Sequence, residues 1–425
     1  MTAHAFAPRV ALWSVLAVLA AAPSASAQVD PARAEAYFAE AAALCAREGG
    51  RIWGVSLCGP IVIGDAATGT IATNQPAPEA PRPRAIGFAN AAMRWGTERW
   101  TTVVWSLIPE DPGRRARLWL HELFHRVQPD LGLFVQDADN AHLDTREGRY
   151  WLQLEWRALD AALASAGDAR RAAVADALAF RAARHARFPE AAETERRLII
   201  NEGLAQYTGT VAGFVDRAAA VADARAQLDE APASPTLVRT FPYPLGTAYG
   251  LLLDDVSPGW PRRMTGDVDP VAMLVAAAGL RASPDPAEAA ARYDGAALAD
   301  AEAARERERE ARVAALRRRF VDGPVVVVPA GRNASFVTAG LTPIPGAGTV
   351  VQQYRVAGDW GSLEADDVLL SPDRQRLTLP GPYTRDGSVV RGAGWTITLA
   401  PGWDLQPGPR PGDATVGRSA AGNDL

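Results

Sequence analysis

Two histidines and a glutamate in the segment His121-Glu122-Leu123-Phe124-His125 have the types and the spacing to bind a metal ion. Residues four apart in a helix lie on one face, so His121 and His125 can direct imidazole nitrogens at the same ion. Glu122 would lie beside the ion, placed to take a proton from a water molecule that attacks a carbonyl group. The chain has five histidines in all, which makes a chance match on the order of one in a few hundred. The segment therefore predicts a catalytic zinc site.

A catalytic zinc site needs a third protein ligand. The segment 126–131 after the second histidine excludes the subtype in which another histidine follows soon after the motif. Glu202 is the preferred candidate, because this acidic residue interrupts an apolar helical face and Gly203 beside it would let the backbone pass close to the metal. The alternatives that stay open are His142, Glu147, Glu155 and Glu195.

These motifs resemble those of the gluzincins, metallopeptidases with His-Glu-x-x-His and a downstream glutamate ligand. The aminopeptidase-like branch has Asn-Glu before a helical turn of small residues, which is similar to the segment 201–205. Its Tyr-x-x-Gly pattern is similar to the segment 243–246, and this resemblance implies that Tyr243 stabilises the oxyanion. The chain departs from the pattern in its spacing, because 76 residues separate His125 from Glu202.

The helix that must carry the first motif has clear limits in the sequence. Asp111 is a favourable N-cap, Pro112 suits the first helical position, and Pro129 ends the pattern, so we expect a helix over 112–128. A second helix, over 190–212, would carry Glu202. Gln206, one turn later, and Asn201 are candidates to hydrogen bond with the ligand histidines.

The remaining pattern predicts an α+β fold in four parts. Residues 1–27 are an expected signal peptide, 28–110 a strand-rich N-terminal part, 111–322 a helical zincin-like catalytic domain, and 323–425 a C-terminal β module. The Pro- and Gly-rich tail beyond Gly402 is expected to be partly disordered. Further helices are expected at 145–166, 168–186, 247–253 and 285–320, and strands at 52–63, 68–73, 100–108, 325–328, 349–355, 376–379 and 395–399.

The N-terminal residues are typical of an export signal. Arg9 precedes an apolar run over 10–22, and Ala25-Ser26-Ala27 offers a cleavage site, so we expect an exported protein that is periplasmic or secreted. Cys45 and Cys58 are then expected to form one structural disulfide. We expect no stable membrane span after signal cleavage.

Composition and motif together favour an exported zinc metallopeptidase with a peptide or protein substrate. The net charge of −5 gives no indication of nucleic-acid binding. Peptide-bond hydrolysis is inferred by analogy, because sites of this type mostly perform that reaction. The alternative is a catalytically silent envelope protein of the same fold that acts in binding or maturation. The sequence does not indicate the oligomeric state.

Overall fold

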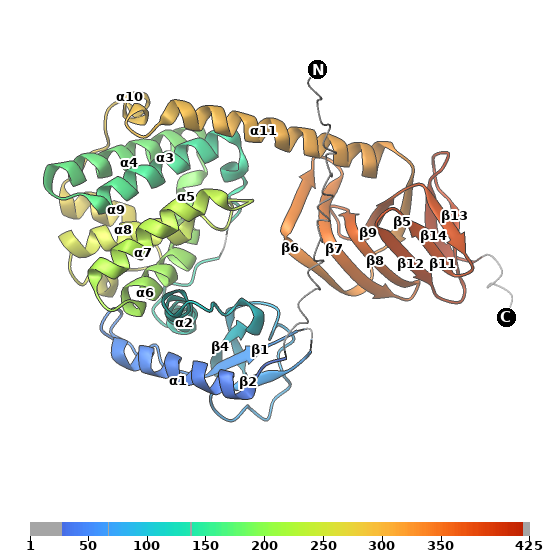
Figure 1. Cartoon of the computed structure of the whole chain (residues 1–425), viewed down its shortest axis with the longest axis horizontal. Helices are drawn as coiled ribbons and strands as arrows, with labels where there is room; N and C mark the ends of the chain where they lie inside the picture. The colour runs from blue at the N-terminus through green and yellow to red at the C-terminus, as the bar shows by residue number, and fades with distance from the viewer. Residues whose placement is uncertain (1–27, 67, 137, 420–425) are drawn as a thin grey trace, which may run out of the picture. The chain divides into compact units, whose positions relative to one another are not determined.

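The computed structural model of the chain describes residues 28–66, 68–136 and 138–419. The expected signal peptide, residues 1–27, lies outside this part of the chain. Helices dominate the middle of the sequence, and strands lie before and after them (Figure 1), which confirms the α+β class. The chain divides into two compact units, the first formed by 28–134, 205–220 and 261–265, and the second by the rest of the described residues.

The first unit combines a small sheet with three helices. The strands run in the order β2-β1-β4-β3; β1 and β4 are parallel, and the two outer pairs are antiparallel. Val62, Ile86, Trp95 and Trp100 form a buried cluster on this sheet. The elements are α1 (Pro31–Glu48), β1 (Ile61–Gly64), β2 (Ile71–Thr73), β3 (Ala91–Trp95), β4 (Glu98–Val104), α2 (Pro112–Val127) and α6 (Leu204–Gly213).

The expected helix over 112–128 is confirmed by α2. The Asp111 side chain accepts a hydrogen bond from the backbone N–H of Arg114, and Pro112 occupies the first turn. One face of α2 is apolar and buried, and it includes Trp119, Leu123 and Phe124. Packing of this face fixes the orientation of the helix, and therefore the direction in which His121 and His125 point.

All three strand predictions in the first unit are too long, and the one over 68–73 is reduced to β2, Ile71–Thr73. The segment 52–60 is not a strand, because Gly49, Gly50 and Gly54 have positive φ angles and fold it into turns. The strand expected over 100–108 ends at Val104 and continues as a short 3₁₀ helix. Its parallel partner β1 also ends there, with Gly64 opposite Val104, so the later residues have no strand of that partner to pair with.

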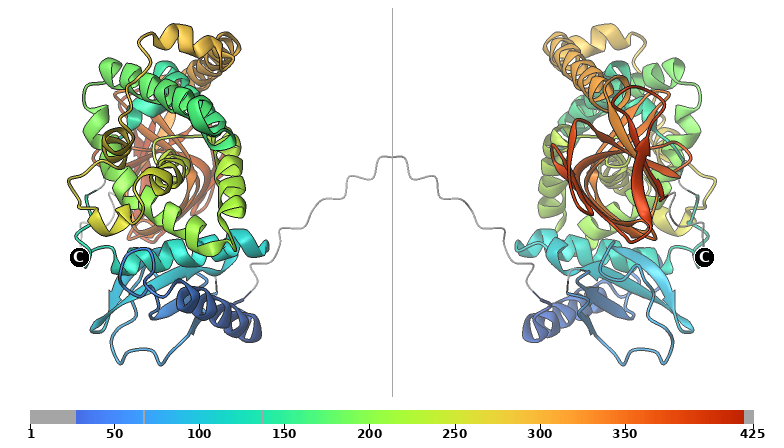
Figure 2. Two further views of the ribbon diagram at one scale, coloured as in Figure 1. Left: turned by 90° about the vertical axis from the view of Figure 1, so that its left-hand side faces the viewer. Right: turned by 90° about the vertical axis from the view of Figure 1, so that its right-hand side faces the viewer.

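The second unit begins with a helical array. Helices α3 and α4 pack along each other, and α5 runs into a π-helical turn (η3) that contacts α8. Figure 2 shows these helices from two opposite sides. The elements are α3 (Arg146–Ala164), α4 (Gly167–Arg187), α5 (Ala191–Leu198), η3 (Ile199–Gly203), α7 (Arg217–Glu230), which starts in the first unit, α8 (Pro242–Val256), α9 (Pro270–Ala278), α10 (Pro286–Ala291) and α11 (Gly295–Arg317).

Within the described residues, the C-terminal strands form one ten-stranded sheet that curls around a buried core. Tyr354, Trp360 and Trp395 are among the large side chains in this core. The strands are β5 (Val325–Pro329), β6 (Arg332–Ile344), β7 (Gly348–Gly358), β8 (Gly361–Leu370), β9 (Arg376–Pro380), β10 (Tyr383–Asp386), β11 (Val389–Gly392), β12 (Trp395–Leu399), β13 (Trp403–Pro407) and β14 (Ala414–Arg418).

The expectation of a partly disordered tail beyond Gly402 is wrong for the described residues up to 419. Strands β13 and β14 form an antiparallel pair, and β14 also pairs in parallel with β5. Ala414 and Val416 alternate into the core of the sheet, which the number of prolines and glycines in the segment conceals. Across the described chain, the helices are too short or too polar to cross a membrane.

Candidate metal centre

His121 and His125 lie one turn apart on α2 and direct the same ring atom to a common point. Their Nε2 atoms are 3.1 Å apart, and the rings meet edge to face. His121 is buried, and His125 is half-buried. Glu122 is buried next to His121, and its backbone carbonyl accepts a hydrogen bond from Thr101 of β4.

Each imidazole is oriented by a glutamine. His121 Nδ1 lies 2.9 Å from Oε1 of Gln206, and His125 Nδ1 lies 2.8 Å from Oε1 of Gln128. An amide oxygen accepts a hydrogen bond, so each Nδ1 carries the proton and each Nε2 presents its lone pair. The pair therefore has the tautomers that a metal site requires.

The predicted contact of Gln206 with a histidine of the motif is confirmed at His121, and glycines on α6 explain it. A Cβ atom at Gly209 would lie 2.5 Å from the backbone oxygen of Arg117, and Gly213 also meets the backbone of that residue. Helix α6 therefore packs directly on the backbone of α2. Arg117 is one turn before His121, so the close approach carries Gln206 to the His121 ring.

Glu202 lies in the π-helical turn η3, immediately before α6. One ligand atom each from His121, His125 and Glu202 can be chosen so that all three lie within 4.8 Å of one another. Ligands about 2.0 Å from a tetrahedral zinc ion are roughly 3.3 Å apart, close to the separation of the two Nε2 atoms. Two imidazole nitrogens and a carboxylate are a donor set that fits zinc. We call these three residues the His/Glu cluster.

Tyr243 lies at the start of α8, half-buried, and its backbone oxygen accepts a hydrogen bond from Thr247. Three residues later, Gly246 meets Gly203 of η3 so closely that a Cβ atom at Gly246 would lie 2.3 Å from the Cα atom of Gly203. The turn of α8 that carries Tyr243 therefore packs against the turn that carries Glu202. Gly203 serves this helix contact.

The alternative ligands Glu155 and Glu195 belong to a buried ion cluster in the second unit, and both side chains are fully buried. Arg184 lies between them, 2.7 Å from an oxygen of each carboxylate. His142 Nε2 lies 2.9 Å from Glu195, and the Tyr249 hydroxyl donates to Glu155 at 2.6 Å. Arg181 and His185 complete this set, which we call the buried ion cluster.

The charges within the buried ion cluster control its protonation. Burial alone would raise the pKa of Glu195, but the charge and hydrogen bonds of Arg184, with hydrogen bonds from His142 and His185, hold that pKa well below its ordinary value. Burial and the neighbouring Glu155 raise the pKa of the Tyr249 phenol well above its ordinary value. Glu147, the remaining alternative ligand, forms an exposed ion pair with Arg187.

The last turn of α2 is hydrogen bonded to the loop between α1 and β1 through Arg126. Arg126 Nη2 donates to the backbone oxygens of Cys58 at 2.6 Å and Leu57 at 3.3 Å. Burial is the main cause that lowers the pKa of the Arg126 guanidinium.

The predicted disulfide between Cys45 and Cys58 is confirmed, with Cα atoms 5.2 Å apart. Neither Arg126 nor Gln128 was among the predicted site residues, although Gln128 follows His125 by one helical turn.

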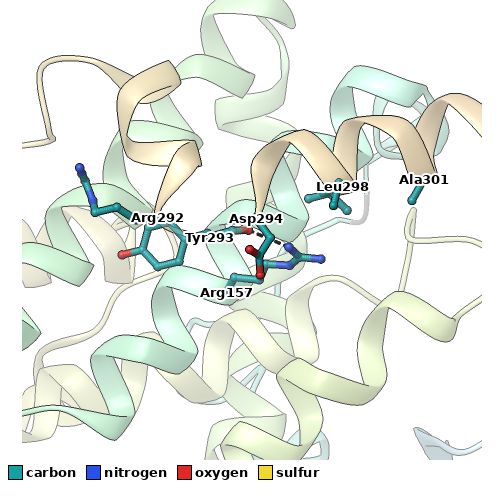
Figure 3. A pocket seen from close by; sticks show the side chains of 7 residues that line it. Arg157, Arg292, Tyr293, Asp294, Leu298 and Ala301 are labelled. Atoms are coloured by element: carbon teal, nitrogen blue, oxygen red, sulfur yellow. Dashed lines mark hydrogen bonds between the residues drawn. The ribbon is translucent and has the colours of Figure 1, made fainter.

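A cavity of about 480 Å³ opens elsewhere, where α10 meets α11 (Figure 3). Arg157 and Tyr293 line it, and Arg157 Nη1 donates to the backbone oxygen of Tyr293 at 2.7 Å. None of the predicted site residues lines this cavity.

Comparisons with protein-family models, curated proteins and solved structures find no match to the chain.

Proposed function

We propose that the chain is an exported zinc-dependent metallopeptidase that hydrolyses peptide bonds. The proposal depends above all on the His/Glu cluster, in which two imidazole nitrogens that present their lone pairs converge beside a carboxylate. A buried glutamate, Glu122, adjoins the first histidine on the same helix. This combination of donors and a neighbouring base is the requirement for hydrolysis assisted by a metal ion.

In this proposal, His121, His125 and Glu202 hold the zinc ion. When bound, zinc would supply a Lewis acid that polarises the attacking water and the carbonyl of the scissile peptide bond. Gln206 and Gln128 keep the two histidines in the tautomer and orientation that binding needs. A rigid donor set of this kind keeps its geometry without the need to order three side chains at each binding event.

Glu122 acts as the general base that takes the proton from the water and then delivers it to the leaving amine. Its position follows from helix geometry, because residue 122 lies about 60° around the axis from residue 125, at the side of the face that carries both histidines. Tyr243 donates a hydrogen bond to the oxygen on which negative charge develops. Its place on the turn of α8 that packs against η3 supports this role.

The proposed domain type is zincin-like, of the gluzincin kind. The long separation between His125 and Glu202 is occupied by α3, α4 and α5, which form much of the buried ion cluster. We interpret α3, α4 and α5 as an insertion that lengthens the spacing between His125 and Glu202. The buried ion cluster forms the polar core of this insertion. In this proposal the insertion lengthens the chain and leaves the ligand set of the family intact.

Export to the periplasm or the medium belongs to the same proposal. A disulfide between Cys45 and Cys58 is compatible with an oxidising compartment. The expected substrate is an extracytoplasmic peptide or protein, and neither nucleic acid nor a membrane span is part of the proposal.

The test combines metal analysis with a peptide-library assay on the purified mature chain. We expect about one zinc per chain, cleavage of library peptides detected by mass spectrometry, loss of cleavage with a chelator, and recovery on addition of zinc. Zinc binding without cleavage of any library peptide would favour the alternative of a silent binding or maturation factor. A folded chain that binds no zinc would overturn the proposal.

A further inference from the structure

The disulfide loop, residues 45–58, contacts the guanidinium of Arg126 at its C-terminal end. Besides the two hydrogen bonds to the oxygens of Leu57 and Cys58, the next residue, Gly59, lies directly against this side chain. A Cβ atom at Gly59 would lie 2.3 Å from Arg126 Nε and 2.4 Å from Cζ. The guanidinium therefore contacts the backbone of residues 57–59, directly beside the disulfide.

Arg126 lies within the turn of α2 that carries the second histidine. Its own backbone oxygen accepts a hydrogen bond from Arg99 at 2.5 Å, and Arg99 also pairs with Asp130 beyond the end of the helix. The final turn of a helix has carbonyl groups without partners in the helix, so it frays unless other groups hold it. The turn from His125 to Gln128 is thus fixed by contacts outside α2.

We infer that Arg126 is a positioning residue that connects the Cys45–Cys58 loop to His125, so that metal affinity at the His/Glu cluster depends on the disulfide. The inference rests on the metal-binding part of the proposed function. Loss of the disulfide removes the crosslink at Cys58, so the carbonyl that accepts the 2.6 Å hydrogen bond from Arg126 is held less firmly. His125 and its partner Gln128 lose the rigid turn that orients them.

The contact that Trp53 of the loop makes with α2 does not replace this connection. Trp53 packs on Phe124 with ring centroids 4.7 Å apart, and its indole N–H donates to Thr208 of α6 at 2.8 Å. These contacts hold the middle of α2 against α6. Arg126 is the described link between the disulfide end of the loop and the last turn.

A double-mutant cycle on the full mature chain tests the connection. The four chains are the parent, Arg126→Leu, Cys45→Ser with Cys58→Ser, and the combination, and each is titrated with zinc against a chromophoric chelator. We expect each change alone to weaken zinc binding by about 10 to 100 fold, as for groups that support a ligand. The combination should be no weaker than the weaker single chain, because both changes break the same link. Effects that multiply would overturn the inference.

Arg262→Leu is the matched control. Arg262 donates to the backbone oxygens of Gly50 and Arg51 at 3.2 and 3.0 Å, so it holds the same loop through the same type of contact, away from α2. We expect its zinc affinity to stay within about threefold of the parent. Arg126→Lys, which retains one donor group, should recover part of the lost affinity. Equal losses in Arg262→Leu and Arg126→Leu would mean that the loop acts only on general stability.

Hydrogen exchange separates this inference from the proposed function. If the parent chain binds no zinc, the proposed function fails, but the amides of residues 125–128 still report on the last turn. Faster exchange there in both Arg126→Leu and the serine chain supports the link, and unchanged exchange in either chain overturns it.

Discussion

Gly203 and Gly246 touch backbone to backbone, at the point where the π-helical turn η3 meets α8. A side chain on Gly246 would overlap the Cα, C and O atoms of Gly203, with Cβ at 2.3 to 2.4 Å from them. Glu202 precedes the first glycine by one residue, and Tyr243 precedes the second by three. Two small residues thus determine how closely the segments that carry these groups approach each other.

Gly246→Ala should therefore disturb both stability and metal binding. Backbone atoms must move to admit the methyl group, so we expect a loss of about 1–3 kcal/mol in the free energy of unfolding and weaker zinc binding. Gly203→Ala is the graded comparison, since its Cβ would lie 3.0 Å or more from its neighbours. Urea unfolding with zinc titration checks both chains. A larger effect in Gly203→Ala would contradict this steric order.

Glu122→Gln should retain zinc and lose nearly all turnover. The amide has about the size of the carboxylate but cannot accept the proton, and both histidine ligands remain. We expect a decrease in kcat of about 10² to 10⁴ fold with unchanged metal content. Peptide cleavage measured together with metal analysis decides the matter. Turnover within a few fold of the parent would remove Glu122 from the proposed mechanism.

The third ligand is tested by three alanine substitutions. Glu202→Ala should purify nearly free of zinc yet folded, because only two protein ligands remain. Glu155→Ala and His142→Ala should retain zinc, since both side chains contact partners of the buried ion cluster. Glu155→Ala should also lose about 3–5 kcal/mol of stability, because it removes one of the two buried carboxylates that contact Arg184 and takes the acceptor from the Tyr249 hydroxyl. Stoichiometric zinc in Glu202→Ala would make the ligand assignment wrong.

Tyr243→Phe and Tyr249→Phe should separate a catalytic effect from a structural one. Loss of the Tyr243 hydroxyl should lower kcat on the order of 10² fold with little change in zinc content or thermal stability. Loss of the Tyr249 hydroxyl removes a buried hydrogen bond to Glu155 and should reduce stability by about 1–3 kcal/mol. Steady-state kinetics and thermal unfolding are the measurements. An unchanged rate in Tyr243→Phe would remove Tyr243 from the proposed mechanism.

Acid should weaken the buried ion cluster through Glu195. Its folded-state pKa lies well below the ordinary value of 4.5, so its charge stabilises the fold above pH 4.5 and the contribution declines as the pH falls below that value. Glu195→Gln lacks this titration. Unfolding free energies at pH 7, 5, 4 and 3 should show a difference between parent and variant that is constant down to about pH 5 and then decreases. A difference that stays constant to pH 3 would contradict the assignment.

Local chemistry made the α2 helix predictable. Asp111, Pro112 and Pro129 act within a few residues of the helix ends, and the spacing of His121 and His125 follows from helix geometry alone. The predicted convergence with Glu202 needed more than local pattern, because 76 residues intervene. For that residue the useful signal was a carboxylate on an apolar face.

Contacts between distant segments were beyond the sequence. Arg184 reads as an ordinary surface charge on an amphipathic helix, yet it is fully buried between carboxylates from α3 and α5. The predicted strand lengths were wrong for the same reason. Strand β4 ends at Val104, where its partner strand β1 ends, although the apolar run in the sequence continues. The strands of the tail were concealed because pairing with β5, some ninety residues earlier, outweighs the local preference for turns.

The π-helical turn η3 changes the direction in which side chains point along the continuous helical segment from α5 to α6. Eleven residues separate Glu195 from Gln206, which in an uninterrupted α-helix is about three turns plus 20°, so the two side chains would point the same way. A turn with i to i+5 hydrogen bonds takes up one extra residue and rotates the subsequent helix, α6, by about 100° relative to α5. Glu195 can therefore face the buried ion cluster while Gln206 faces the His121 ring. Deletion of a single residue in η3 would remove this extra residue and turn the side chains that follow it by about 100° around the helix axis.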